Sequence, residues 1–235
     1  MKDFEPTPPQ HLEPLAKDVL EGLRGREGAR FIVLGGGVAL QHYVEFRRTV
    51  DIDAWWGGEV RTETRDLLTR VMEDVGRARG LQLVKRSWGE TESYELLKGQ
   101  EKMFSFQIAL RSVQLEAAKH SAWQPVQVES FRDNLGSKMS ALVGRGAPRD
   151  FLDVREVCRR GLAREDECWQ VWQEKNPDRN VREARVNVLR HLELLESRRP
   201  LVALAENERE AAQTLRDWVR QSLCRERNRD REIGR

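Results

Sequence analysis

Two aspartates, Asp51 and Asp53, stand two residues apart in a segment where polar and apolar residues alternate. Successive side chains of a β-strand point to opposite faces, so both carboxylates are expected on one face and Ile52 on the other. Two carboxylates on one face can share a divalent cation such as Mg²⁺ or Mn²⁺, because these ions accept oxygen ligands. Mg²⁺ usually completes its shell with water and substrate phosphates, so the pair predicts a metal site that opens onto a nucleotide.

A glycine triplet, Gly35 to Gly37, precedes this segment and follows an apolar run from Phe31 to Leu34. Glycine tolerates positive φ and lets the backbone approach a phosphate closely. A short helix is predicted from Val38 to Phe46, and the free N–H groups at its start favour negative charge. Arg47 and Thr49, just before the first aspartate, are expected either to hold a triphosphate or to fix the entry of the strand. Each motif is common by itself, and their order along the chain is what predicts a site.

A second group of charged residues lies far downstream, in a segment with helical periodicity. Lys138 and Arg145 fall near one face of a predicted helix, two turns apart, where a cationic pair can grip the phosphates of a nucleotide. Pro148 begins the next helix, which carries Asp150 and Asp153 one turn apart. Asp150 is either a hydrogen-bond acceptor or base of the site, or a favourable residue at a helix N-terminus. The alternative for the two cations is a solvated helix face.

Two domains are expected to position these residues: a mixed α/β domain over residues 1–129 and a helical domain over residues 130–235. The first contains two further predicted helices, His11–Leu23 and Arg61–Arg79, the second of which ends at Gly80. Its strands are predicted at Phe31–Leu34, Val50–Trp56, Leu81–Arg86, Ser93–Leu97, Met103–Leu110 and Val126–Val128, with a hairpin at residues 98–100. A cleft between the domains is the expected substrate site. About a dozen residues at the C-terminus are too polar to fold alone.

Composition narrows the class of protein. Charged residues make up 34% of the 235 residues but nearly cancel to a net charge of +2, which excludes a strongly basic nucleic-acid arm. The three cysteines form no CxxC pair, so we expect a reducing compartment and no zinc site. The N-terminus lacks a signal-peptide pattern, and no run of eighteen apolar residues occurs. We therefore expect a cytoplasmic protein without a membrane partner.

Together these motifs resemble the AbiEii/AbiGii nucleotidyltransferase toxin family. That family has a glycine turn, an R-x-[ST]-x-D-x-D strand, and then lysine, arginine and RD-x-x-D positions on helices. The match runs in order from about residue 31 to residue 162. The resemblance implies an α+β fold: a minimal, polymerase beta-like nucleotidyltransferase domain with a mixed sheet and helices, followed by a helical C-terminal domain.

The resemblance also implies roles for individual residues and for partners. The nucleotide-binding residues are Gly35, Gly36, Arg47, Thr49, Lys138 and Arg145; the metal ligands are Asp51 and Asp53; and the catalytic acids are Asp51, Asp53 and Asp150. Such proteins are the toxins of toxin–antitoxin or abortive-infection (phage defence) systems, and some relatives add nucleotides to the 3′ end of tRNA. The implied partners are an NTP, Mg²⁺ or Mn²⁺, an RNA acceptor such as tRNA, and a cognate antitoxin.

One position departs from the nucleotidyltransferase pattern. These enzymes usually bring a third carboxylate from a later strand, but the strand Met103–Leu110 offers Gln107 and no acid. Glu95, on the preceding strand, is the alternative. The departure keeps a second function open, in which the chain is a nucleotide-binding or antitoxin-binding module with weakened catalysis. A third hypothesis retains the enzyme and replaces RNA with a small-molecule or protein hydroxyl.

Overall fold

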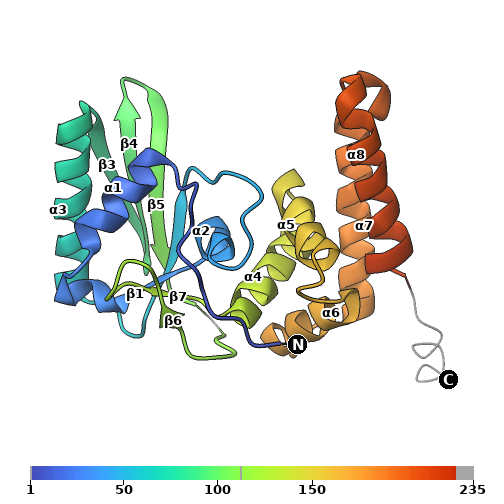
Figure 1. Cartoon of the computed structure of the whole chain (residues 1–235), viewed down its shortest axis with the longest axis horizontal. Helices are drawn as coiled ribbons and strands as arrows, with labels where there is room; N and C mark the ends of the chain where they lie inside the picture. Colours follow the sequence, from blue (N-terminus) through green and yellow to red (C-terminus); the bar gives the residue numbers. More distant parts are fainter. Residues whose placement is uncertain (1, 112, 226–235) are drawn as a thin grey trace. The chain divides into compact units, whose positions relative to one another are not determined.

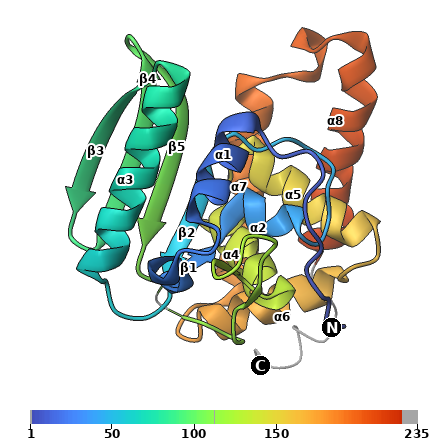
Figure 2. The same ribbon diagram turned by 60° about the vertical axis from the view of Figure 1, so that its left-hand side comes forward.

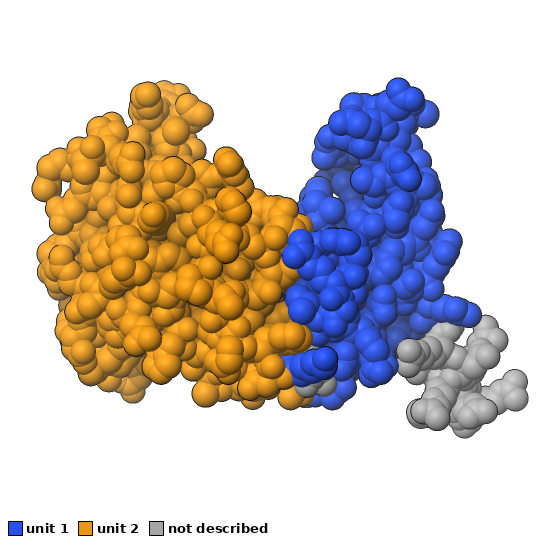
Figure 3. All heavy atoms as spheres, in the orientation of Figure 1, with its two compact units in different colours: residues 1–2, 135–235 blue, residues 3–134 orange. Residues whose placement is uncertain are grey.

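The computed structural model describes residues 2–111 and 113–225 (Figure 1). The chain divides into two compact units, which are coloured separately in Figure 3. The N-terminal unit holds residues 3–134, and the C-terminal unit holds residues 1–2 and 135–235. The polar tail that we predicted to be unfolded lies, from residue 226 on, outside the described residues.

The N-terminal unit is built on a mixed seven-stranded sheet with the order β3-β4-β5-β2-β1-β7-β6. Strand β2 pairs antiparallel with β1 and parallel with β5, and β1 also pairs parallel with β7. The remaining pairs, β3 with β4, β4 with β5 and β6 with β7, are antiparallel. The strands are β1 (Ile32–Leu34), β2 (Ile52–Trp56), β3 (Gln82–Trp88), β4 (Thr91–Lys98), β5 (Glu101–Ala109), β6 (Lys119–His120) and β7 (Gln127–Val128).

Helices α1 (Pro14–Leu23) and α3 (Thr62–Arg79) lie on one face of this sheet (Figures 1 and 2). The sequence produces this layer because both helices place apolar residues at helical spacing, and these pack on alternate residues of the strands. The alternation in β2 leaves Ile52 and Ala54 buried beneath the helices, while Asp53 is half-buried on the other face. The core is therefore on the helix side of β2, and the carboxylate of Asp53 is on the opposite side.

The predicted order of elements agrees with the structure, but several boundaries were wrong. Helix α1 begins at Pro14 rather than His11, because proline fits the first turn of a helix. Helix α2 covers Gly36–Gln41, not Val38–Phe46, so two glycines lie inside its first turn. The β3–β4 hairpin, which turns at Gly89, and strand β6 were not predicted.

The start of β2 was also placed too early. The strand begins at Ile52, so Asp51 lies just outside it. The side chain of Asp51 accepts a hydrogen bond from the backbone N–H of Ser105 at 3.0 Å. The N–H of Ser105 therefore pairs with the side chain of Asp51, whereas a longer β2 would have paired this N–H with its backbone.

The C-terminal unit consists of helices in the part of it that the structure describes. They are α4 (Phe131–Gly144, which begins in the N-terminal unit), α5 (Pro148–Arg159), α6 (Glu165–Lys175), α7 (Val181–Arg198) and α8 (Glu206–Trp218). The three cysteines are free thiols, two of which, Cys158 and Cys168, have their sulfur atoms 3.5 Å apart. No helix among the described residues is long and apolar enough to cross a membrane.

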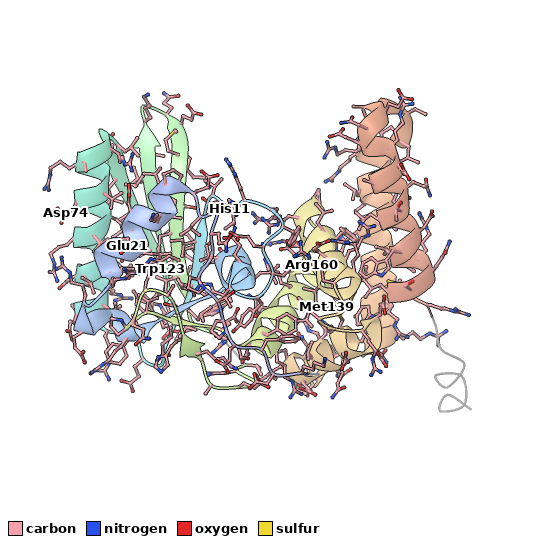
Figure 4. All side chains as sticks on the ribbon, in the orientation of Figure 1. His11, Glu21, Asp74, Trp123, Met139 and Arg160 are labelled. Carbon is pink, nitrogen blue, oxygen red and sulfur yellow. The ribbon has the colours of Figure 1, made fainter. Side chains whose placement is uncertain are left out.

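We expect a buried histidine, His42, to make the free energy of unfolding depend on pH. The His42 ring packs edge-on against Trp123 with ring centroids 5.8 Å apart; Figure 4 labels Trp123. Burial lowers the pKa of His42 below its ordinary value of 6.5, and the hydrogen bond between Nδ1 and the Val38 carbonyl offsets this in part. The unfolded chain then binds a proton that the folded protein excludes. We expect the free energy of unfolding to fall as the pH drops through about 6.5.

Urea unfolding between pH 7.5 and 5 measures this dependence. His42→Phe keeps the packing on Trp123 and should flatten the profile, whereas His120→Phe, at an exposed position, should not. Three carboxylates have pKa values lowered from the ordinary 4.5, so they change the free energy of unfolding at more acidic pH than His42 does. They are Glu45, Glu156 and Glu167. An equally steep profile in His42→Phe would show that another group is responsible.

Candidate active site

The glycine triplet packs directly against the residues that lead into and form β2. Gly35 is in extended conformation and donates its N–H to the carbonyl of Asp53 at 2.8 Å. Gly36 follows with a φ of +57°, in the left-handed region that side chains disfavour. These two residues end β1 and begin α2 within a single step, which places the first turn of α2 beside Asp53.

Glycine is required at positions 36 and 37 because protein side chains occupy the space beside them. A Cβ on Gly36 would lie 2.3 Å from Oδ2 of Asp53, and one on Gly37 would lie 2.6 Å from Oγ1 of Thr49. The close approach expected for a phosphate is therefore made here by the DxD segment itself. The glycine turn and the carboxylate of Asp53 are therefore packed in direct contact.

Asp51 is held firmly by strand β5. Its Oδ1 accepts hydrogen bonds from both the backbone N–H and the hydroxyl of Ser105, at 3.0 and 2.8 Å. Its Oδ2 lies 3.9 Å from Nζ of Lys102. These contacts fix the orientation of the carboxylate, and among the described residues Lys102 is the only cation within ion-pair distance of Oδ2. Ser105 was not singled out in the sequence, because a serine in a strand carries no local signal of such a role.

Asp53 differs from Asp51, because no group among the described residues donates a hydrogen bond to its carboxylate. It faces Gln107 directly across the β2–β5 pairing, and the side chain of Gln107 is exposed. Two carboxylates and an amide oxygen are a donor set that suits a hard divalent cation. Within residues 2–111 and 113–225, no third histidine, cysteine or acid joins them to form a metal cluster.

Glu95 does not lie next to the aspartates. It pairs in register with Ser105 on β5, so the full width of β5 separates it from β2, roughly 10 Å for two strand spacings. Its carboxylate contacts Nη1 of Arg86 at 3.0 Å. The residue at the position expected for a third carboxylate is therefore Gln107.

Arg47 and Thr49 lie over the first turn of α2. Thr49 contacts Gly37 as described above, and an ideal Cβ on Gly37 would lie 3.5 Å from Nη2 of Arg47. The carbonyl of Arg47 accepts a hydrogen bond from the side chain of Gln41 at 3.0 Å, which ties the loop to the end of α2. The structure thus places both residues beside the glycine turn; the predicted contact of Arg47 and Thr49 with a triphosphate stays a prediction.

The second predicted group belongs to the C-terminal unit, where each cation faces an acid of α5. Nζ of Lys138 lies 2.7 Å from Oδ2 of Asp153, and both side chains are buried. Arg145, just after α4, forms a two-pronged pair with Asp150 at 2.9 and 3.0 Å. Asp150 is fully buried and also accepts the backbone N–H of Ala147 at 3.2 Å. These pairs orient the cations, and the roles predicted for Lys138, Arg145 and Asp150 toward a nucleotide stay predictions.

Comparison with models of known protein families shows where this chain belongs. The family model described as nucleotidyl transferase AbiEii toxin, type IV TA system, matches residues 18–222, which include both groups of predicted site residues. No curated protein matches the chain.

Proposed function

Because the chain belongs to the AbiEii nucleotidyl transferase toxin family of type IV toxin–antitoxin systems, we propose that it transfers a nucleotide from a metal-bound NTP to a hydroxyl of RNA, such as tRNA. The observation that supports this most is the packing of Gly36 against Asp53, which puts the proposed phosphate-binding turn next to a proposed metal ligand. An acceptor oxygen forms a bond to the α-phosphorus, the bond to pyrophosphate breaks, and the hydroxyl proton is released.

The residues of the chain divide the work in this proposal. Asp51 and Asp53 would hold Mg²⁺ or Mn²⁺, which, when bound, supplies charge neutralisation at the phosphates. Ser105 orients Asp51 in advance, so the Asp51 side chain would lose little conformational entropy when a ligand binds. The nucleotide-binding residues would be Gly35, Gly36, Arg47 and Thr49 at the turn, with Lys138 and Arg145 as triphosphate cations. Asp150 would be the helical acid of the site, and it orients Arg145.

The direct test is to incubate the protein with each labelled NTP, Mg²⁺ or Mn²⁺, and total tRNA. Parallel reactions should replace tRNA with other RNA, with small polyols, and with a cell protein extract, since the third hypothesis places the acceptor hydroxyl elsewhere. We expect label on tRNA that disappears in Asp51→Asn and Asp53→Asn variants. Transfer that does not depend on these residues, or no transfer to any acceptor, would refute the proposal.

A second function is favoured by Gln107, which stands opposite Asp53 where a third carboxylate is usual. In this alternative the chain binds a nucleotide or its antitoxin and has lost most of its catalysis. Calorimetry with each NTP distinguishes the two, because NTP binding without turnover on any acceptor supports the binding module.

Gln107→Glu tests how much the missing carboxylate matters. A carboxylate facing Asp53 adds a full negative charge next to the proposed metal ligands, so we expect at least about tenfold tighter Mn²⁺ binding, equal to about 1.4 kcal/mol. Calorimetric titration with Mn²⁺ measures the change. Gln100→Glu, in the exposed turn between β4 and β5, makes the same change in charge away from the site. Equal Mn²⁺ affinities in the two variants would show that position 107 is not part of a metal site.

A further inference from the structure

Four polar residues within a six-residue stretch, 129–134, are fully buried where β7 leads into α4. They are Glu129, Ser130, Asp133 and Asn134, and none has measurable exposure. Polar side chains of this kind are seldom buried unless they are paired, because an unpaired buried group costs about 1–3 kcal/mol. Their hydrogen-bond partners therefore show which segments this junction connects.

Asn134 joins the junction to the glycine turn. Its Nδ2 donates to the carbonyl of Gly36 at 3.1 Å and to Oε2 of Glu129 at 3.0 Å. Both partners are acceptors, so both must face the amide nitrogen, which carries two hydrogens. The other orientation of the amide would place its oxygen against two oxygens. The contact with Gly36 is thus a directed hydrogen bond.

Glu129 fixes Asn134 because it is itself held from three separate segments of the chain. Its Oε1 lies 3.2 Å from Nη1 of Arg111, whose side chain is 9% exposed. Its backbone N–H donates to Leu34, at the end of β1, and its carbonyl accepts the hydroxyl of Tyr43 at 2.6 Å. Burial, and then the charge of Glu129, raise the pKa of Tyr43, so this hydroxyl stays protonated and remains a donor.

Asp133 anchors the same cluster on its other side. It accepts the backbone N–H groups of Leu115 and Glu116, at 3.0 and 2.9 Å, and lies 3.5 Å from Arg111. A buried ionic cluster often adds little net stability compared with apolar residues of the same volume. What such a cluster can add is a fixed geometry, and Gly36, whose carbonyl Asn134 holds, is the residue that packs against Asp53.

We infer that Asn134, oriented by Glu129, is a positioning residue of the nucleotide site. By holding the Gly36 carbonyl it keeps Gly36 in its left-handed conformation, with the Asp53 carboxylate packed against it. Asn134 acts through the glycine turn and contacts no reacting atom in this role. The effect on NTP binding rests on the proposed function, whereas the hydrogen bond from Asn134 to Gly36 is present in the fold whatever the function is.

Exchanging the acid and the amide between positions 129 and 134 separates the two contacts of Asn134, because the exchange keeps the net charge. Asn134→Asp removes the donor to both Gly36 and Glu129 and places two carboxylates together. The double variant Glu129→Gln/Asn134→Asp rebuilds the 129–134 hydrogen bond with donor and acceptor exchanged. It leaves the carbonyl of Gly36 without a donor from residue 134. Asn207→Asp, at an exposed position of α8, is the control for the added charge.

Three measurements should be made on each variant: the melting temperature, hydrogen–deuterium exchange of the segment 35–41, and the KM and kcat for transfer from the NTP with Mg²⁺. We expect Asn134→Asp to lower the melting temperature and to raise the NTP KM at least tenfold. The double variant should recover most of the melting temperature. Its segment 35–41 should still exchange faster than in the wild type, and its NTP KM should stay raised more than its kcat is lowered.

A double variant that matches the wild type in exchange and KM would overturn the inference, because the Gly36 contact would then be dispensable. Unchanged exchange in Asn134→Asp would overturn it as well. A wild type that neither binds nor transfers any NTP, together with faster exchange in the double variant, would refute the proposed function while retaining Asn134 as the residue that holds the turn.

Discussion

Asp53→Asn should lower the rate of nucleotide transfer by about 100-fold or more and leave the melting temperature nearly unchanged. The loss in rate follows because the variant removes one of the two proposed anionic metal ligands, and 100-fold corresponds to about 2.7 kcal/mol of transition-state stabilisation. Stability should persist because no group of the described chain donates a hydrogen bond to this carboxylate. Asparagine has the same shape, so the packing on Gly36 is retained. Initial rates with labelled NTP and thermal unfolding measure the two effects.

The matched control is Asp74→Asn, on α3 (Figure 4), where the carboxylate is 69% exposed and pairs with Arg77 on the same helix. It makes the same chemical change on the helix layer, which covers the face of the sheet opposite to Asp53. We expect wild-type rates and stability there. A transfer rate in Asp53→Asn within a fewfold of that in Asp74→Asn would exclude Asp53 from the reaction.

Gly36→Ala should abolish most nucleotide transfer at a stability cost that the protein tolerates. Alanine at a φ of +57° costs about 1–2 kcal/mol of backbone strain. Its Cβ would also lie 2.3 Å from Oδ2 and 2.8 Å from Cβ of Asp53, so the carboxylate must move. A displacement of about 1 Å at a reacting centre can cost 100-fold in rate. Melting temperature, NTP affinity and transfer rate should be measured together.

Gly80→Ala is the matched control for strain alone. Gly80 ends α3 with a φ of +65°, and nothing lies within 4 Å of the position of its Cβ. Gly80→Ala should therefore lose only the strain energy, Gly36→Ala should lose more stability because its Cβ also clashes with Asp53, and only Gly36→Ala should lose activity. If the two variants transfer nucleotides equally well, the contact between the glycine turn and Asp53 does not shape the site.

The local features of this chain could be predicted because short-range physics produces them. The alternation around Ile52 places Asp53 opposite the core, and the apolar spacing of Arg61–Arg79 forms a helix that stops at a left-handed Gly80. The order of the glycine triplet, the two aspartates and the downstream cations indicated the family that the match over residues 18–222 confirmed. Each strand, helix and motif is contained in a short stretch of neighbouring residues, whereas the order of the motifs runs from Gly35 to Arg145.

Only the tertiary structure decided which groups meet. Strand register places Gln107 opposite Asp53 and moves Glu95 a full strand away; the hydroxyl of Ser105 orients Asp51; and Asn134, almost one hundred residues after Gly36, holds its carbonyl. Register and buried hydrogen bonds depend on residues distant in sequence, and a polar residue at the start of a helix gives no local sign of its partner. The sequence by itself therefore determined which chemical groups are available and on which elements they lie. The packing of β2 against β5, and of the glycine turn against β2 and Asn134, determined how those groups are oriented.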